Sequence, residues 1–176
     1  MKKEQDIRHK TIEDIAAKMM AAARTAPKAK GIDTLEIAVA DKNDIEKIAA
    51  RMKEIANDKN LPGFVRDAEN ILKAEAMVLI GTRIKTIGLV YCGLCGFLNC
   101  TEKQNHPEHP CAFNTGDLGI AIGSAVSVAM DARIDNRIMY SVGMAVRELG
   151  MMDADVKIIY GIPLSCTSKN IFFDRG

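Results

Sequence analysis

Apolar residues recur at helical spacing in the first part of the chain. Thr11 is a candidate N-cap and Pro27 ends the pattern, so a first helix with one buried stripe is predicted between them. This stripe consists of Ile12, Ile15, Ala16, Met19 and Ala23. The segment that begins at Thr34, TLEIAVA, alternates as a strand does. Asn43 and Glu46 resemble a capping box before a second amphipathic helix.

Helices and strands continue to alternate along the rest of the chain. After a short helix, the apolar runs AMVLIGT and TIGLVY predict two strands. The segment GDLGIAIGSAVSVAMDA is apolar on nearly every side, which is typical of a helix buried at the centre of a protein or at a subunit interface. A last helix closes at Gly150, and ADVKIIYGIP is the final strand. This order predicts an α/β or α+β layered protein.

No internal repeat, low-complexity tract or linker divides the chain. We therefore predict a single domain over residues 1–176, with a cysteine-rich loop inserted at residues 91–111. Lysine and arginine number 24 and aspartate and glutamate 23, so the net charge is +1 and nothing favours binding to nucleic acid or to an anionic membrane. The sequence shows neither a secretory signal nor a membrane-spanning run, and we expect a cytoplasmic protein.

Four of the five cysteines lie close together in the sequence. Cys92, Cys95, Cys100 and Cys111 have the spacing C-x2-C-x4-C-x10-C. In a reducing cytoplasm such a cluster favours a metal site over disulfides. Three cysteines from one tight loop and a fourth beside a proline are typical of an iron–sulfur cluster, whereas structural zinc sites more often use two C-x2-C-like pairs. The spacing favours a 4Fe–4S cluster, with zinc as the alternative.

The other candidate groups have ordinary structural interpretations beside their functional ones. His106 and His109 lie in the same loop and could replace a cysteine ligand, although exposed loop histidines are the more common case. Cys166 stands apart, as a reactive thiol near Lys169, as a spare ligand or, as is most common for a lone cysteine, as a small buried residue. The sequence contains no Ser-His-Asp set and no Walker loop, so neither hydrolysis nor phosphoryl transfer is supported.

Two resemblances extend this interpretation. The run CGLCGFLNC resembles the signature of ferredoxin-type 4Fe–4S domains, and the whole chain resembles prokaryotic ferredoxin-domain-containing proteins of unknown function. The remainder is similar to nitroreductase-like flavoproteins in three places: ARTAPKAKG before a strand, Asp117 at the start of a helix of small residues, and the ending IIYGIPLSC. The arginine and serine arm that holds the FMN phosphate in nitroreductases is matched only by Arg8 and Thr11.

The nitroreductase resemblance implies an α+β layered domain, with helices around a mixed sheet, that forms a homodimer. It also leaves room for FMN in the space between ARTAPKAKG, the residues after Gly161 and the cysteine loop. The cofactor-binding residues that it implies are Arg24, Lys28, Lys30, Gly161, Lys169 and Arg175.

The sequence therefore predicts a redox protein that passes electrons through a cluster, with or without FMN, to an unknown partner or substrate. Such a protein could be a flavin- and iron–sulfur-dependent oxidoreductase. The alternative is a non-catalytic module in which zinc or a cluster stabilises the cysteine loop.

Overall fold

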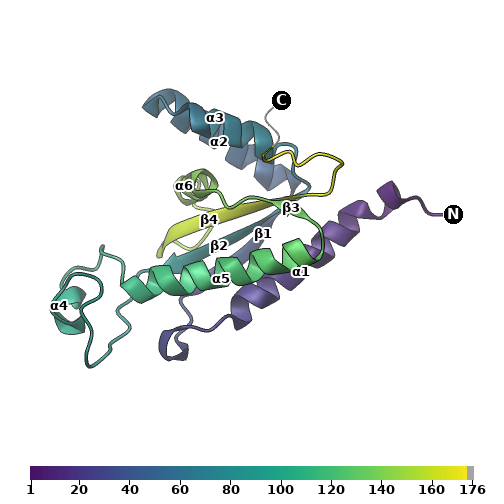
Figure 1. Cartoon of the computed structure of the whole chain (residues 1–176). Helices are drawn as coiled ribbons and strands as arrows, with labels where there is room; N and C mark the ends of the chain where they lie inside the picture. The colour runs from purple at the N-terminus through teal and green to yellow at the C-terminus, as the bar shows by residue number, and fades with distance from the viewer. Residues whose placement is uncertain (174–176) are drawn as a thin grey trace.

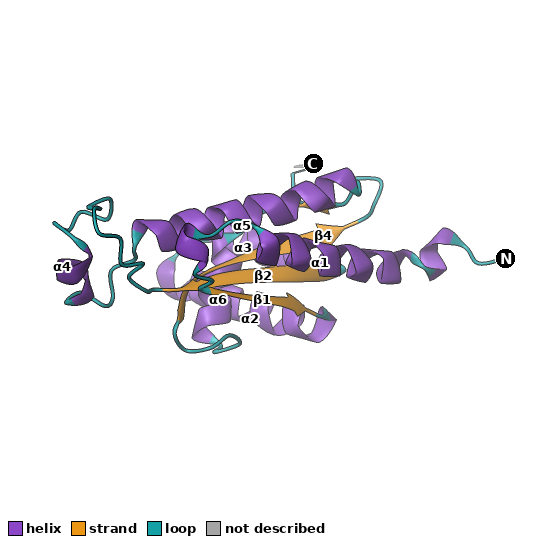
Figure 2. Ribbon diagram, turned by 90° about the horizontal axis from the view of Figure 1, so that it is seen from below, coloured by secondary structure: helices purple, strands orange, loops and turns teal. Residues whose placement is uncertain are grey.

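The computed structural model describes residues 1–173 of the chain and shows three layers, with a sheet between two groups of helices (Figures 1 and 2). Helices α1 and α5 cover one face of the sheet, and α2, α3 and α6 cover the other. The helices are α1 (Arg8–Thr25), α2 (Lys42–Lys59), α3 (Pro62–Ile71), α4 (Cys100–Gln104), α5 (Ala112–Asp131) and α6 (Tyr140–Glu148). The strands are β1 (Leu35–Ala40), β2 (Ala76–Arg83), β3 (Asp135–Asn136) and β4 (Val156–Ser165).

The strand order is β1-β2-β4-β3, and every pairing in the described residues is antiparallel. The layered α+β class is thus confirmed, but the sheet is not mixed as expected. The reason is the path of α2 and α3. The chain leaves the sheet after Ala40 and returns at Ala76, and the pairing of Ala40 with Met77 shows that both points lie at the same end of the strands. A chain that re-enters the sheet at the end where it left runs back in the opposite direction, so β2 is antiparallel to β1.

Strand β2 is the centre of the core. Its side chains alternate between the two faces, as strand geometry requires. Val78 and Ile80 pack with α1 and α5, whereas Met77 and Leu79 pack with α2, α3 and α6. Both faces are covered, which explains why AMVLIGT is continuously apolar instead of alternating.

Two helix starts differ from the sequence prediction. Helix α1 begins at Arg8, and Thr11 lies inside it, where its hydroxyl donates to the carbonyl of Ile7. Helix α2 is capped by Asp41, whose carboxylate accepts the backbone N–H of Asp44 at 2.9 Å. The expected capping box at Asn43 and Glu46 is therefore wrong, because Asp41, an equally good N-cap residue, starts the helix two residues earlier.

The predicted strand TIGLVY is wrong, because residues 86–91 form a loop. Strand β2 lies between β1 and β4. Both neighbours are antiparallel to it, so their first residues lie beside its last ones. Leu35 pairs with Thr82, and Val156 pairs with Arg83. Beyond Arg83 the apolar run has no neighbouring strand to receive its backbone hydrogen bonds, and it leaves the sheet.

In Figure 1 the segment between β2 and α5 projects from the layered body and carries α4 at its far side. The structure thus separates the layered core from the segment with the four cysteines, although the boundaries 91–111 stay a prediction. Across the described residues, no helix combines the length and the apolar character that crossing a membrane requires.

Candidate functional site

The four cysteines lie along one projecting segment that ends at the start of α5. Cys92, Cys95 and Cys100 are half-buried, and Cys111 is 3% exposed. The two glycines next to the first pair shape the turn. The N–H of Gly96 donates to the carbonyl of Gly93 at 3.0 Å, and Gly96 has a φ of 87°, a conformation that favours glycine.

Helix α4 is a single capped turn that begins at Cys100. The side chain of Asn99 accepts the backbone N–H of Glu102 at 2.9 Å, and the Glu102 carboxylate accepts the N–H of Leu98 at 2.6 Å. Lys103, one turn after Cys100, is only 2% exposed. Lysine is seldom so buried without an anionic partner, so this part of the segment favours negative charge.

Within residues 1–173, no group of three or more His, Cys, Asp or Glu side chains is gathered as a metal ion requires. The set of four cysteine ligands therefore stays a prediction that rests on spacing and chemistry. The donor chemistry itself fits an iron–sulfur cluster, since soft thiolates on one short segment are its usual ligands.

The two histidines of the segment pack around Phe97. The rings of Phe97 and His106 are stacked with centroids 4.8 Å apart, and His109 meets Phe97 edge-on at 5.5 Å. Both histidines are exposed. These contacts give them a structural role beside the cysteines.

The first turns of α5 tie the cysteine segment to the body. Cys111 is the N-cap residue, and one turn later Asn114 accepts the backbone N–H of Lys85 at 2.9 Å. One turn further, the carboxylate of Asp117 accepts the N–H of Ala29 at 3.0 Å. These two side chains are buried, and together they fasten the loops after β2 and α1 to one helix end.

The basic residues after α1 are already engaged in structural contacts. Lys28 donates through Nζ to the carbonyls of Ala23, Arg24 and Ala26 at 2.8, 2.6 and 2.8 Å, which closes the C-terminus of α1. Lys30 donates to the carbonyl of Gly88 at 3.3 Å. Both lysines therefore stabilise the loop beside the cysteine segment.

Arg24 forms an ion pair with Asp33 at 2.6 Å. Burial raises the pKa of Asp33, whereas hydrogen bonds from Arg24 and from the backbone N–H of Leu35 lower it, and the net pKa is below the usual value for aspartate. This pair closes the loop that joins α1 to β1.

The remaining predicted flavin residues lie elsewhere. Gly161 is inside β4, where an added Cβ would lie 2.3 Å from the Val142 side chain, so glycine permits α6 to pack closely on the sheet. Lys169 is exposed in the loop after β4, and Arg175 lies outside the described residues. The end of β4 pairs with Ala76. The loop ARTAPKAKG precedes β1, which begins at the opposite end of the strands. One chain therefore does not bring the predicted flavin residues into one site.

The matched phosphate arm does meet the residue that follows β4. Arg8 and Thr11, the remnants of the phosphate arm, line a cavity of about 140 Å³ together with Cys166, which follows β4. Arg8 is already paired with Glu4 through two hydrogen bonds of 2.6 and 2.5 Å. The groups present therefore do not make an open phosphate site there.

The cysteine segment borders two hollows of about 410 and 540 Å³. Leu94 and Phe113 line both, and Cys92 lines the larger one. Tyr91, Leu94 and Leu98 are 98%, 73% and 82% exposed. The surface next to the cysteines is thus apolar.

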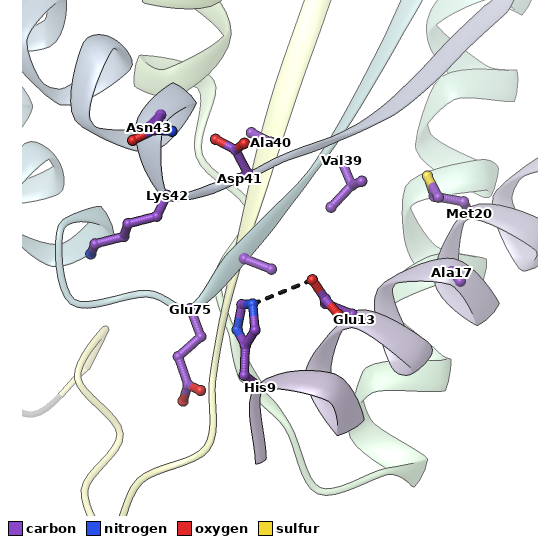
Figure 3. Close-up of a pocket in the computed structure, with 11 residues that line it drawn as sticks. His9, Glu13, Ala17, Met20, Val39, Ala40, Asp41, Lys42, Asn43 and Glu75 are labelled. Carbon is purple, nitrogen blue, oxygen red and sulfur yellow. Dashed lines mark ion pairs between the residues drawn. The ribbon is translucent and has the colours of Figure 1, made fainter. Parts of the chain in front are cut away.

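A further hollow, of about 440 Å³, lies between α1, the end of β1 and the start of α2 (Figure 3). His9 Nε2 is 3.3 Å from Glu13 Oε1 on its α1 wall, and Asp41 and Glu75 contribute two more carboxylates. Sequence reasoning missed this hollow. The only available signal was the spacing of His9 and Glu13, which places both on one helix face but says nothing about the facing strand.

Solved nitroreductases and flavoproteins share this fold. A nitroreductase from Lactococcus lactis in complex with nicotinic acid has a TM-score of 0.64 at 10% identity, over 89% of this chain and 79% of that chain. A nitroreductase with bound FMN from Desulfitobacterium hafniense has a TM-score of 0.62 at 12% identity, with the same two coverages. A BluB-like flavoprotein from Clostridium difficile has a TM-score of 0.55 at 20% identity, over 89% and 84%. The predicted nitroreductase-like fold is confirmed.

The sequence comparisons concern the cysteine-containing part as well. A family model described as "uncharacterized protein containing a ferredoxin domain (DUF2148)" matches residues 108–175, which include Cys111. A protein from Archaeoglobus fulgidus, itself described as uncharacterized, is 46% identical over 182 residues, which are 98% of this chain and 96% of the relative. The chain therefore belongs to the family of uncharacterized proteins that contain a ferredoxin domain.

Proposed function

We propose that this protein is a redox protein that holds a 4Fe–4S cluster through Cys92, Cys95, Cys100 and Cys111 and passes electrons to a partner or substrate. The observation that supports it most is the position of the cysteines, all on one projecting segment that ends at the buried N-cap of α5. The ferredoxin-domain family and the fold shared with flavoproteins both agree with a redox role.

The residues around the cysteines suit an anionic group. The N-terminus of the 20-residue helix α5, where Cys111 is the N-cap, carries the positive end of the helix dipole, which favours a negatively charged group. The buried Lys103 adds a positive charge one turn after Cys100. A bound cluster would supply one-electron transfer, and the apolar surface of Tyr91, Leu94 and Leu98 would let an electron partner approach closely.

The exposed side of α5 supports a homodimer. A Cβ added at Gly119 or Gly123 would meet no atom within 4 Å, and Ile120 is 50% exposed. Beside these glycines is a hollow of about 370 Å³ whose lining includes Tyr160. A second copy of the chain is the partner that we assign to this apolar face.

FMN enters the proposal only through the dimer. Arg24, Lys28 and Lys30 lie at the C-terminal end of α1, whereas Lys169 follows Cys166, which lies beside the first turn of α1. A helix of 18 residues is about 27 Å long, so we do not expect one chain to bring both groups to one flavin. Groups from both copies are needed. We derive no step through FMN from the single chain.

Anaerobic reconstitution with iron and sulfide tests the cluster. The wild-type protein is expected to hold about four iron and four sulfide per chain and to show a broad absorption shoulder near 400 nm that bleaches on reduction. Replacing any of the four cysteines with alanine is expected to lower the iron content severely. Cys166→Ala is the matched control, because Cys166 lies beyond β4 at the other end of the sheet.

The outcomes separate the alternatives. Stoichiometric zinc with no iron–sulfur absorption, or iron loading that survives loss of Cys92 or Cys111, would overturn the proposal. A cluster in a protein to which added FMN does not bind would retain electron transfer and remove the flavin. Equal loss of iron in Cys166→Ala would show that the ligand set is wrong.

A further inference from the structure

Asn114 has a buried amide group that the protein fold does not use. The residue is 0% exposed, and its Nδ2 has no hydrogen-bond partner among the described residues. Its Oδ1 accepts the backbone N–H of Lys85 at 2.9 Å. This bond fixes the orientation of the amide, since Nδ2 could not accept from that N–H if the group were turned round.

Leaving a buried donor without an acceptor is costly, so in native proteins such a group usually bonds to an ordered water, an ion or a ligand. The ligand must be a hydrogen-bond acceptor. Asn114 is three residues after the N-cap Cys111, and its backbone N–H donates to the carbonyl of Cys111 at 2.9 Å. Cys111 is 3% exposed, so a cluster bound to its sulfur would lie against the same buried helix end.

We propose that the Asn114 amide donates a hydrogen bond to a sulfur atom of the cluster at Cys111 and thereby raises the midpoint potential of that cluster. The inference rests on the proposed function and adds a residue that sets its potential. An N–H directed at sulfur stabilises the reduced, more negative cluster more than the oxidised one. The same donor also offsets part of the cost of burying the charge.

Two variants remove the donor in different ways. Asn114→Asp keeps an oxygen for the N–H of Lys85 and replaces the donor with a negative charge, and Asn114→Leu removes the donor without adding charge. Thr115→Asp is the matched control, because it adds a carboxylate to the same turn at an exposed position. All four proteins are reconstituted without oxygen, assayed for iron and sulfide, and titrated with EPR detection.

Both Asn114 variants are expected to load the cluster and to have a more negative midpoint potential than the wild type. A tenfold change in the one-electron reduction equilibrium corresponds to about 59 mV, and at least this shift is expected for Asn114→Asp. Thr115→Asp should shift less, since solvent screens its charge. Loaded Asn114 variants with the wild-type potential, or with no larger shift than Thr115→Asp, would overturn the inference and leave the cluster itself established.

A measurement on the unaltered site covers the case in which neither Asn114 variant loads. With ¹⁵N in the side-chain amides of asparagine, pulsed EPR of the reduced cluster should detect one weakly coupled nitrogen that persists when Asn99 and Asn105 are changed to aspartate. A reduced cluster without that coupling contradicts the inference. A wild-type protein that loads no cluster contradicts both the proposed function and this inference.

Discussion

The carboxylate of Asp117 on α5 accepts a 3.0 Å hydrogen bond from the backbone N–H of Ala29, a residue 88 positions earlier in the chain. The Asp117 side chain is buried, so this contact joins the loop after α1 to the helix that follows the cysteines. The resemblance to nitroreductases places an aspartate here, and in the structure its side chain holds the loop after α1 against α5.

Replacing Asp117 with alanine is expected to lower the free energy of unfolding by about 1–3 kcal/mol, because the half-buried N–H of Ala29 loses its acceptor. Asp117→Asn keeps an acceptor oxygen and should lose less. Urea denaturation followed by circular dichroism measures both. Thr115→Ala, on the exposed side of the same helix, is the control. An alanine variant at 117 no less stable than this control would show that the contact contributes nothing.

Two glycine-to-alanine changes are expected to have opposite effects. At Gly143 on α6, an added Cβ would lie 1.7 Å from the backbone oxygen of Ile159, so helix and strand must separate and the protein should lose several kcal/mol or fail to fold. At Gly116 on α5, the Cβ would meet nothing within 4 Å, and alanine should stabilise the helix by about 1 kcal/mol. Denaturation midpoints compare them, and equal destabilisation would contradict the close packing of α6 on β4.

The Arg24–Asp33 pair predicts a loss of stability in acid. The pKa of Asp33 is lowered in the folded protein, so the unfolded chain takes up a proton first as the pH falls. The pair's contribution is fully present above the unfolded pKa of about 4 and is lost as the pH falls toward the folded pKa. Urea unfolding at pH 6 and at pH 3 should show a smaller decrease for Asp33→Asn than for the wild type. An identical decrease would mean that other carboxylates account for the acid sensitivity.

The proposed dimer predicts a specific response to bulk on α5. Sedimentation velocity should give a dimer for the wild type and a monomer for Gly119→Arg, whose side chain has free space within one chain but would block a second copy. Ala50→Arg, at an exposed position on α2, should remain dimeric. A monomeric wild type, or a dimer that tolerates Gly119→Arg, would exclude this face as the interface.

The elements of the layered body follow from local pattern. The stripe from Ile12 to Ala23 and the apolar run AMVLIGT predict a helix and a buried strand because periodicity reports which side of an element is buried. The same rule failed for TIGLVY. Its apolar pattern is that of a strand, but a strand also needs a neighbour to pair with. The pairing of β1 and β4 with β2 does not extend past Arg83, so TIGLVY has no partner.

The candidate site was only partly predictable for a related reason. The spacing of Cys92, Cys95, Cys100 and Cys111 is a local property, and it points to a metal centre whatever fold surrounds it. The flavin set required residues that are distant in the chain to meet. Lys28 caps α1 and Gly161 lies under Val142, so each matched a motif by residue type and serves packing in the fold.

The amino-acid sequence by itself determined most of the secondary-structure elements, the layered class and the thiol-rich segment, since each depends on residues close together along the chain. Tertiary structure decided which polar groups are left without partners. Asn114 looks like an ordinary helix residue in the sequence. Only the approach of Lys85 from the preceding loop occupies its oxygen and leaves its nitrogen buried without a partner among residues 1–173, as the proposed bond to the cluster requires.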